Sequence, residues 1–129
     1  MTGRRSNQPI FSEMIEVLIR VGVSQNASLV LFQLITEGSC DTSTLKKNCG
    51  ISQPEVSLGI TELRNIGVVN VESIYSDERG RPRHIYSLNG SIEEALGPII
   101  ERTQDRLDEL DRSMIRIEEI SDTIRSKSR

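Results

Sequence analysis

The chain has 129 residues, of which 36% are hydrophobic and 3% aromatic, with no tryptophan and a formal net charge of −3 at pH 7. This length suits one domain or a small domain with an appendage, and so few aromatic side chains argue against a large cofactor pocket. Few cysteines, no secretory signal pattern and no long apolar run predict a soluble cytoplasmic protein without a membrane span.

The negative charge is concentrated in the C-terminal part of the chain. Residues 1–89 hold nine Lys and Arg side chains against nine Asp and Glu, whereas residues 90–129 hold seven against ten. The basic residues of the first part cluster at Arg4 and Arg5, at Lys46 and Lys47, and in the stretch DERGRPRH, residues 77–84. Such local clusters matter more for phosphate binding than a pI near 5.2.

The N-terminal residues 1–9 have no apolar periodicity and end in a proline suited to a helix start. They predict a flexible basic arm, or simple terminal disorder. Apolar residues then recur at helical spacing from Ile10 to Val21, and Gly22 is expected to end this first helix.

Two further helices are predicted between residues 24 and 50. Ser24 suits the cap of the first, and Gly38 its C-terminal stop. A short helix follows, capped at Asp41 or Thr42 and closed at Gly50. The predicted inward stripe of the longer helix consists of Ala27, Leu31, Leu34 and Ile35.

The stretch SQPE, residues 52–55, predicts a fourth helix that begins with a capping box. In this motif the Ser52 hydroxyl accepts from the backbone N–H of Glu55, whose carboxylate reaches back to Ser52; a proline is tolerated in the first turn. Gly67 ends the helix, and its two faces differ in polarity. The core face holds Val56, Ile60 and Leu63, and the opposite face holds Gln53, Ser57, Thr61 and Arg64.

A β-hairpin is predicted next. The stretches VVNVESIY and RHIYSL are rich in β-branched and aromatic residues, and they flank the turn SDERGRP. The buried side of the hairpin is expected to hold Val69, Val71, Tyr86 and Leu88.

The last segment, residues 90–129, predicts one long helix with the 3.5-residue period of a coiled coil. Such a helix extends on the order of 50 Å, too long to fold back wholly onto a small body, so we expect dimerisation through it. Gly97 and Pro98 are expected to bend or restart it, and packing on its own body is the alternative. The repeating positions are Leu96, Ile100, Thr103, Leu107, Leu110, Met114, Ile117, Ser121 and Ile124.

This order of elements resembles the winged helix-turn-helix domains of MarR-type and TrmB-type transcriptional regulators. The stretches VGVSQNASLVLFQLITEG and GISQPEVSLGITELRNIGVV carry the resemblance, which covers about residues 10–89. It implies a mainly α fold with a small β-hairpin: a DNA-binding domain at 10–89, preceded by the arm at 1–9 and followed by a dimerisation helix at 90–129.

The resemblance also implies that the fourth helix enters the DNA major groove. Gln53 suits a bidentate contact with adenine, and a thymine methyl group suits Leu58. Glu55 and the presence of a single basic side chain, Arg64, weaken this interpretation, and a solvated helix face is the alternative. The implied recognition-helix residues are Gln53, Pro54, Ser57, Leu58, Thr61 and Arg64.

The hairpin tip is the expected source of additional affinity. Its stretch RGRP is also the core of the AT-hook, whose arginines lie along a narrow A·T minor groove. Because Asp77 and Glu78 offset part of the charge, an ordinary solvated tip is the alternative. The candidate wing residues are Arg79, Gly80, Arg81, Pro82 and Arg83, and the candidate phosphate contacts are Arg4, Arg5, Lys46 and Lys47.

The remaining candidate groups predict no cofactor and no metal site. Cys40 and Cys49 lack a second Cys or His pair, so buried thiols are expected, with redox sensing as the less favoured interpretation. Lys46 and Lys47 also suit the C-terminal end of a helix dipole.

The sequence as a whole predicts a homodimeric, sequence-specific DNA-binding regulator with a pseudopalindromic duplex site, and an effector that is unknown. A protein-docking winged helix and an architectural DNA-binding protein are the alternatives. The sequence contains no nucleophile–base pair and no phosphate-binding loop, so we do not expect an enzyme.

Overall fold

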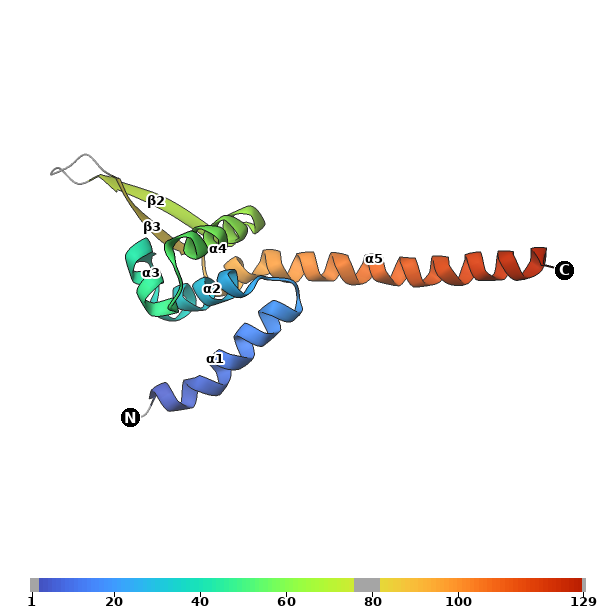
Figure 1. Cartoon of the computed structure of the whole chain (residues 1–129), viewed down its shortest axis with the longest axis horizontal. Coiled ribbons are helices and arrows are strands. Elements are labelled where there is room, and N and C mark those ends of the chain that lie inside the picture. Colours follow the sequence, from blue (N-terminus) through green and yellow to red (C-terminus); the bar gives the residue numbers. More distant parts are fainter. Residues whose placement is uncertain (1–2, 76–81, 129) are drawn as a thin grey trace. The chain divides into compact units, whose positions relative to one another are not determined.

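The structure is a computed structural model, and it describes residues 3–75 and 82–128. The fold is mainly helical with one small antiparallel sheet, as the sequence predicts (Figure 1). In chain order the elements are α1 (Gly3–Arg20), α2 (Gln25–Glu37), β1 (Cys40–Asp41), α3 (Thr42–Cys49), α4 (Gln53–Ile66), β2 (Val69–Tyr75), β3 (Pro82–Leu88) and α5 (Ile92–Lys127).

The predicted helix caps are confirmed. The Ser24 hydroxyl accepts from the Ala27 backbone N–H at 3.2 Å, and an Asp41 carboxylate oxygen accepts from the Thr44 N–H at 2.8 Å. Of the two candidate caps of α3, Asp41 is therefore the one used. The glycines that close α2, α3 and α4 have φ values of 84°, 67° and 98°, a region that side chains with a Cβ rarely adopt.

The start of α1 differs from the prediction. The helix begins at Gly3 rather than near Ile10, so residues 3–9, predicted as a flexible arm, are helical. Apolar periodicity reports which side of a helix is buried, and a polar stretch can continue a helix without it. The proline at position 9 therefore lies inside α1 and does not mark its beginning.

The sheet has three strands in the order β1-β3-β2, all antiparallel. The hairpin is as predicted. Val69 pairs with Leu88 and Val71 with Tyr86, which puts the four residues expected on its buried side on one face; Val69 is buried and the other three are half-buried. β1 was not predicted. It has two residues, which pair with Tyr86 and Ile85, and so short a strand leaves no periodic pattern in the sequence.

α2 is the central helix of the first compact unit, which comprises residues up to Pro98. It packs against α1, α3, α4 and β3 (Figure 1). Phe32 of α2 stacks obliquely on Phe11 of α1, with ring centroids 4.1 Å apart. The buried residues of α2 are Ala27, Ser28, Val30, Leu31, Phe32 and Leu34.

α5 spans both compact units, because the second unit begins at Ile99. The helix is continuous from Ile92 to Lys127 and contains Pro98, so the restart predicted at Gly97 and Pro98 does not occur. Its first turn has a capping box in which Ser91 N–H donates to Glu94 Oε1 and Glu94 N–H donates to the Ser91 hydroxyl.

Candidate nucleic-acid interface

The start of α4 is the capping box that the sequence predicts. Ser52 N–H donates to Glu55 Oε1 at 2.8 Å, and Glu55 N–H donates to the Ser52 hydroxyl at 3.3 Å. The hydrogen bond from the Ser52 backbone holds the pKa of the Glu55 carboxyl below its ordinary value. Glu55 therefore stays ionised at neutral pH, and the positive end of the helix dipole partly offsets its charge.

The two faces of α4 are separated as the spacing predicts. Val56, Ile60 and Leu63 are buried, and Gly59 is buried beside them. The opposite face is open along its whole length, and Leu58 on it is 66% exposed. All six candidate recognition residues are exposed: Gln53, Pro54, Ser57, Leu58, Thr61 and Arg64.

Two contacts that the sequence analysis missed hold α4 against the start of α2. A Cβ at Gly59 would lie 3.1 Å from the carbonyl carbon and oxygen of Asn26 and 3.2 Å from the Ala27 nitrogen. Glu62 Oε2 accepts from the backbone N–H of Ser24 at 2.8 Å. A glycine in a helix interior costs about 1 kcal/mol relative to alanine, so its presence there usually has a packing reason. Gly59 was therefore the one feature of the sequence that could have indicated this close approach.

Arg83, in the residue pair next to the one that borders the hairpin tip, links β3 to the start of α3. Its Nη2 and Nε atoms lie 3.1 and 3.2 Å from Oδ2 of Asp41, the residue that caps α3. The backbone N–H of Thr44 is the main cause of a lowered pKa at Asp41, and Arg83 adds to it. Because the Arg83 side chain is 67% exposed, it remains open to a further anion.

The tip of the wing lies outside the described residues, which excludes Arg79, Gly80 and Arg81 from a structural account. Beside it, Tyr75 at the end of β2 pairs with Pro82 at the start of β3 and is 71% exposed. The strands therefore carry the chain to the predicted arginine turn from both sides.

The candidate phosphate contacts lie on two helices. Lys46 and Lys47 are exposed in the last turn of α3, as the sequence predicts. Arg4 and Arg5 belong to the first turn of α1 rather than to an arm.

The cysteines are packed thiols. Cys40 is buried, and its thiol donates to the Gly38 carbonyl at 3.3 Å; Cys49 is half-buried and donates to the Leu29 carbonyl at 3.5 Å. Burial raises the pKa of Cys40 and raises that of Cys49 to about 11. Since the thiolate is the reactive form, both thiols are expected to react slowly at neutral pH.

No group of three or more potential metal ligands occurs among residues 3–75 and 82–128. In the same part of the chain, every helix is too short or too polar to cross a bilayer.

The fold is similar to solved structures of transcriptional regulators. A possible transcriptional regulator from Methanosarcina mazei is 17% identical with a TM-score of 0.64, over 78% of this chain and 83% of that one. A MarR family regulator from Neisseria meningitidis is 19% identical with a TM-score of 0.51, over 98% and 95% of the two chains. For a transcriptional regulator from Thermotoga maritima the values are 15% and 0.51, over 95% and 86%.

No protein-family model matches the sequence, and no curated protein is significantly similar to it. The chain nevertheless has the winged-helix fold of MarR-type regulators, with a long C-terminal helix. The comparisons do not single out the TrmB type, which stays a prediction.

Proposed function

We propose that the protein is a homodimeric, sequence-specific DNA-binding transcriptional regulator. Its fold is shared with solved transcriptional regulators. The observation that carries the proposal is the open polar face of α4, which the buried opposite face and the contacts of Gly59 and Glu62 hold in one orientation.

α4 serves as the recognition helix in this proposal. Helices of this kind read base edges through side chains near their N-terminus, where Gln53 and Ser57 lie exposed. Gln53 would pair with adenine, while Leu58 would contact a thymine methyl group. Thr61 and Arg64 follow on the same face and would contact a base or a phosphate.

The wing supplies cationic side chains to the minor groove or the backbone. Arg83, close to the tip end of the hairpin, is exposed and ion-paired with Asp41, and the predicted turn adds Arg79 and Arg81. Narrow minor grooves concentrate negative potential and attract arginine. The arginines of the wing would therefore compensate for the single cation on α4.

Two copies would join through the exposed apolar stripe of α5. A two-fold dimer presents two recognition helices to half-sites about 34 Å apart, one turn of DNA, so the site would be pseudopalindromic.

The test is binding to a pool of genomic duplex fragments, followed by titrations of one selected duplex at several salt concentrations. Gln53→Ala is expected to relax the preference at one base position, whereas Arg81→Glu is expected to weaken binding to all sequences and to lower the salt slope by about one per subunit. Arg112→Glu makes the same charge change on α5 and serves as the control. Unchanged binding by both wing and helix variants would contradict these roles.

A protein-docking module is the second candidate, because α4 carries one basic side chain and exposes Leu58. In that case no duplex would bind at low salt. Leu58→Ala would then weaken capture of a protein partner and leave the protein folded.

A further inference from the structure

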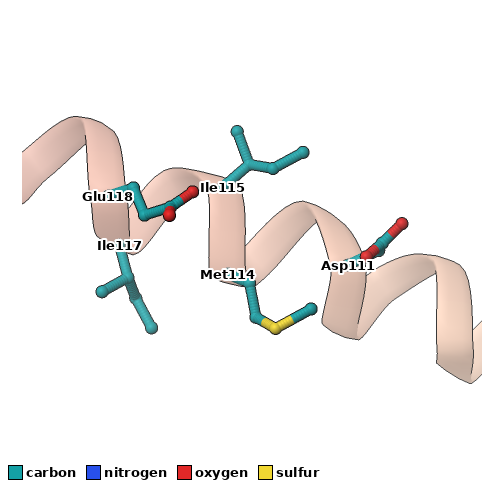
Figure 2. A pocket seen from close by; sticks show the side chains of 5 residues that line it. All are labelled: Asp111, Met114, Ile115, Ile117 and Glu118. Atoms are coloured by element: carbon teal, nitrogen blue, oxygen red, sulfur yellow. The ribbon is translucent and has the colours of Figure 1, made fainter.

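Over its described residues, 99–128, the C-terminal unit consists of the rest of helix α5, which ends at Lys127, and no other part of these residues covers the apolar stripe of the helix. Met114 and Ile117 are 58% and 67% exposed, and both side chains point to the same side of α5 in Figure 2. Contiguous exposed apolar surface of this kind marks an interaction site. The other exposed members of the stripe are Ile100, Leu107, Leu110 and Ile124.

The two edges of this stripe have different charges. Asp111 and Glu118, seven positions apart, lie along one edge and line the same surface groove as Met114 and Ile117 (Figure 2). The other edge has no acidic residue: it begins with Arg106 and continues with neutral and basic residues. In heptad terms the first edge is position e and the second position g. The e edge holds Gln104, Asp111, Glu118 and Arg125, and the g edge holds Arg106, Ser113, Ile120 and Lys127.

Arg106 and Asp111 take part in none of the ion pairs formed within residues 3–75 and 82–128. The e-position Arg125, by contrast, is paired with Asp122 on its own helix. The charged e-position residues that form no ion pair within residues 3–75 and 82–128 are Asp111 and Glu118, and both are acidic. Arg106 precedes Asp111 by five positions, the spacing at which a g residue meets the e residue of a parallel partner.

We propose that α5 of two copies pack as a parallel, in-register coiled coil through the stripe from Ile100 to Ile124, with Arg106 of each copy facing the partner's Asp111. This inference rests on the homodimer proposed above and specifies its geometry. The parallel arrangement forms the Arg106–Asp111 pair twice, once on each side of the seam. It also puts Ser113, a neutral residue, beside the partner's Glu118.

An antiparallel dimer would bring each edge against itself. The antiparallel register that aligns the polar positions Thr103 and Ser121 sets Asp111 directly against the partner's Asp111. Opposed like charges at coiled-coil edges are destabilising. The polar positions do not discriminate between the two arrangements, since Thr103 already donates its hydroxyl to the Ile99 carbonyl at 2.8 Å.

Two serines on α5 allow the arrangements to be distinguished by disulfide formation. Ser121 is a seam residue, so Ser121→Cys puts two thiols within disulfide range only in the parallel, in-register dimer. In the antiparallel register described above the same residues lie about 27 Å apart at ~1.5 Å rise per residue. Ser113→Cys is the matched control, because the two copies of Ser113 meet only in that antiparallel register.

The variants are oxidised at a fixed protein concentration and analysed without reductant, with the unsubstituted protein as the blank for Cys40 and Cys49. We expect Ser121→Cys to form a covalent dimer at least about tenfold faster than Ser113→Cys, because disulfide geometry is strict. Faster cross-linking at Ser113, or none at either position in a protein that sediments as a dimer, overturns the parallel arrangement. A monomer in sedimentation overturns the proposed homodimer itself.

Charge reversal supplies a second readout. Arg106→Glu or Asp111→Arg is expected to raise the dimer dissociation constant about three- to tenfold, and the double variant is expected to restore it. Double-variant affinity no better than that of the weaker single variant contradicts the pairing of Arg106 with the partner's Asp111.

Discussion

Helices α4 and α5 begin in the same way but have different surroundings. Each starts with a capping box, formed by Ser52 with Glu55 and by Ser91 with Glu94, and each carries an apolar stripe at helical spacing. The α4 stripe is buried within the chain, whereas the α5 stripe remains open beyond Pro98. An apolar stripe thus indicates a face to be covered, and it does not identify the covering surface.

The largest expected effect concerns the stripe of α4. Leu63 is fully buried, so Leu63→Ala leaves a cavity and is expected to lower the free energy of unfolding by about 2–5 kcal/mol. Leu58→Ala removes the same atoms from the exposed face of the same helix and is expected to change it by less than about 0.5 kcal/mol. Denaturant titrations at one protein concentration measure both. Equal losses would mean that α4 is covered on both faces.

The corresponding change in α5 is expected to act on self-association. Leu110→Ala removes an exposed stripe residue from each subunit and is expected to cost about 3 kcal/mol per dimer, roughly a hundredfold in Kd. Sedimentation equilibrium gives the Kd, with Glu109→Ala as a neighbouring control. If Leu110→Ala instead lowered the stability of the monomer and left Kd unchanged, the stripe would be covered by its own chain.

Gly59 tests how closely α4 is held. Gly59→Ala places a Cβ 3.1–3.2 Å from backbone atoms of Asn26 and Ala27, so the two helices must separate slightly. We expect a loss of about 1–3 kcal/mol in the free energy of unfolding despite the better helix propensity of alanine. Gly97→Ala is the control in α5, because a Cβ there meets nothing within 4 Å. A stabilising Gly59→Ala would contradict the close approach.

Asp41 both caps α3 and pairs with Arg83 of β3, and two substitutions separate these contributions. Asp41→Ala removes both and is expected to cost about 0.5–2 kcal/mol. Asp41→Asn keeps a capping oxygen but removes the charge that Arg83 contacts, so it is expected to cost less, about 0.2–1 kcal/mol. Thermal unfolding measures both variants. The capping role is wrong if the two variants are equally destabilised.

The sequence was informative wherever structure is decided locally. Caps and glycine stops act within one turn of helix, so Ser24 and Gly67 were identified correctly and Asp41 was one of two candidate caps for α3. The two faces of α4 also followed from spacing alone, because a helix with a capping box and an apolar face has few other ways to pack. The start of α1 was misjudged because its first residues carry no apolar pattern to indicate a helix.

The contacts that position the candidate site could not be predicted from local patterns. Arg83 meets Asp41 across 42 positions of sequence, and Glu62 meets Ser24 across 38. β1 exists only because β3 is there to pair with it. These features depend on how the helices and the sheet pack together. The apolar spacing within one segment carries no information about that packing.

The smallest expected effect concerns the glutamates of the two capping boxes with which α4 and α5 begin. Backbone N–H groups of Ser52 and Ser91 hold the pKa values of Glu55 and Glu94 below their ordinary value of 4.5. At a pH between the pKa of these carboxyls in the folded protein and their pKa in the unfolded chain, the unfolded chain binds more protons. The stability that the two carboxylates contribute is therefore present above pH ~4.5 and is lost as the pH falls further. Glu55→Gln with Glu94→Gln keeps the capping geometry without these carboxylates, because glutamine also serves in a capping box. Its free energy of unfolding is therefore expected to decline less steeply below pH ~4.5 than that of the unsubstituted protein, and an equally steep decline would assign the acid sensitivity to other groups.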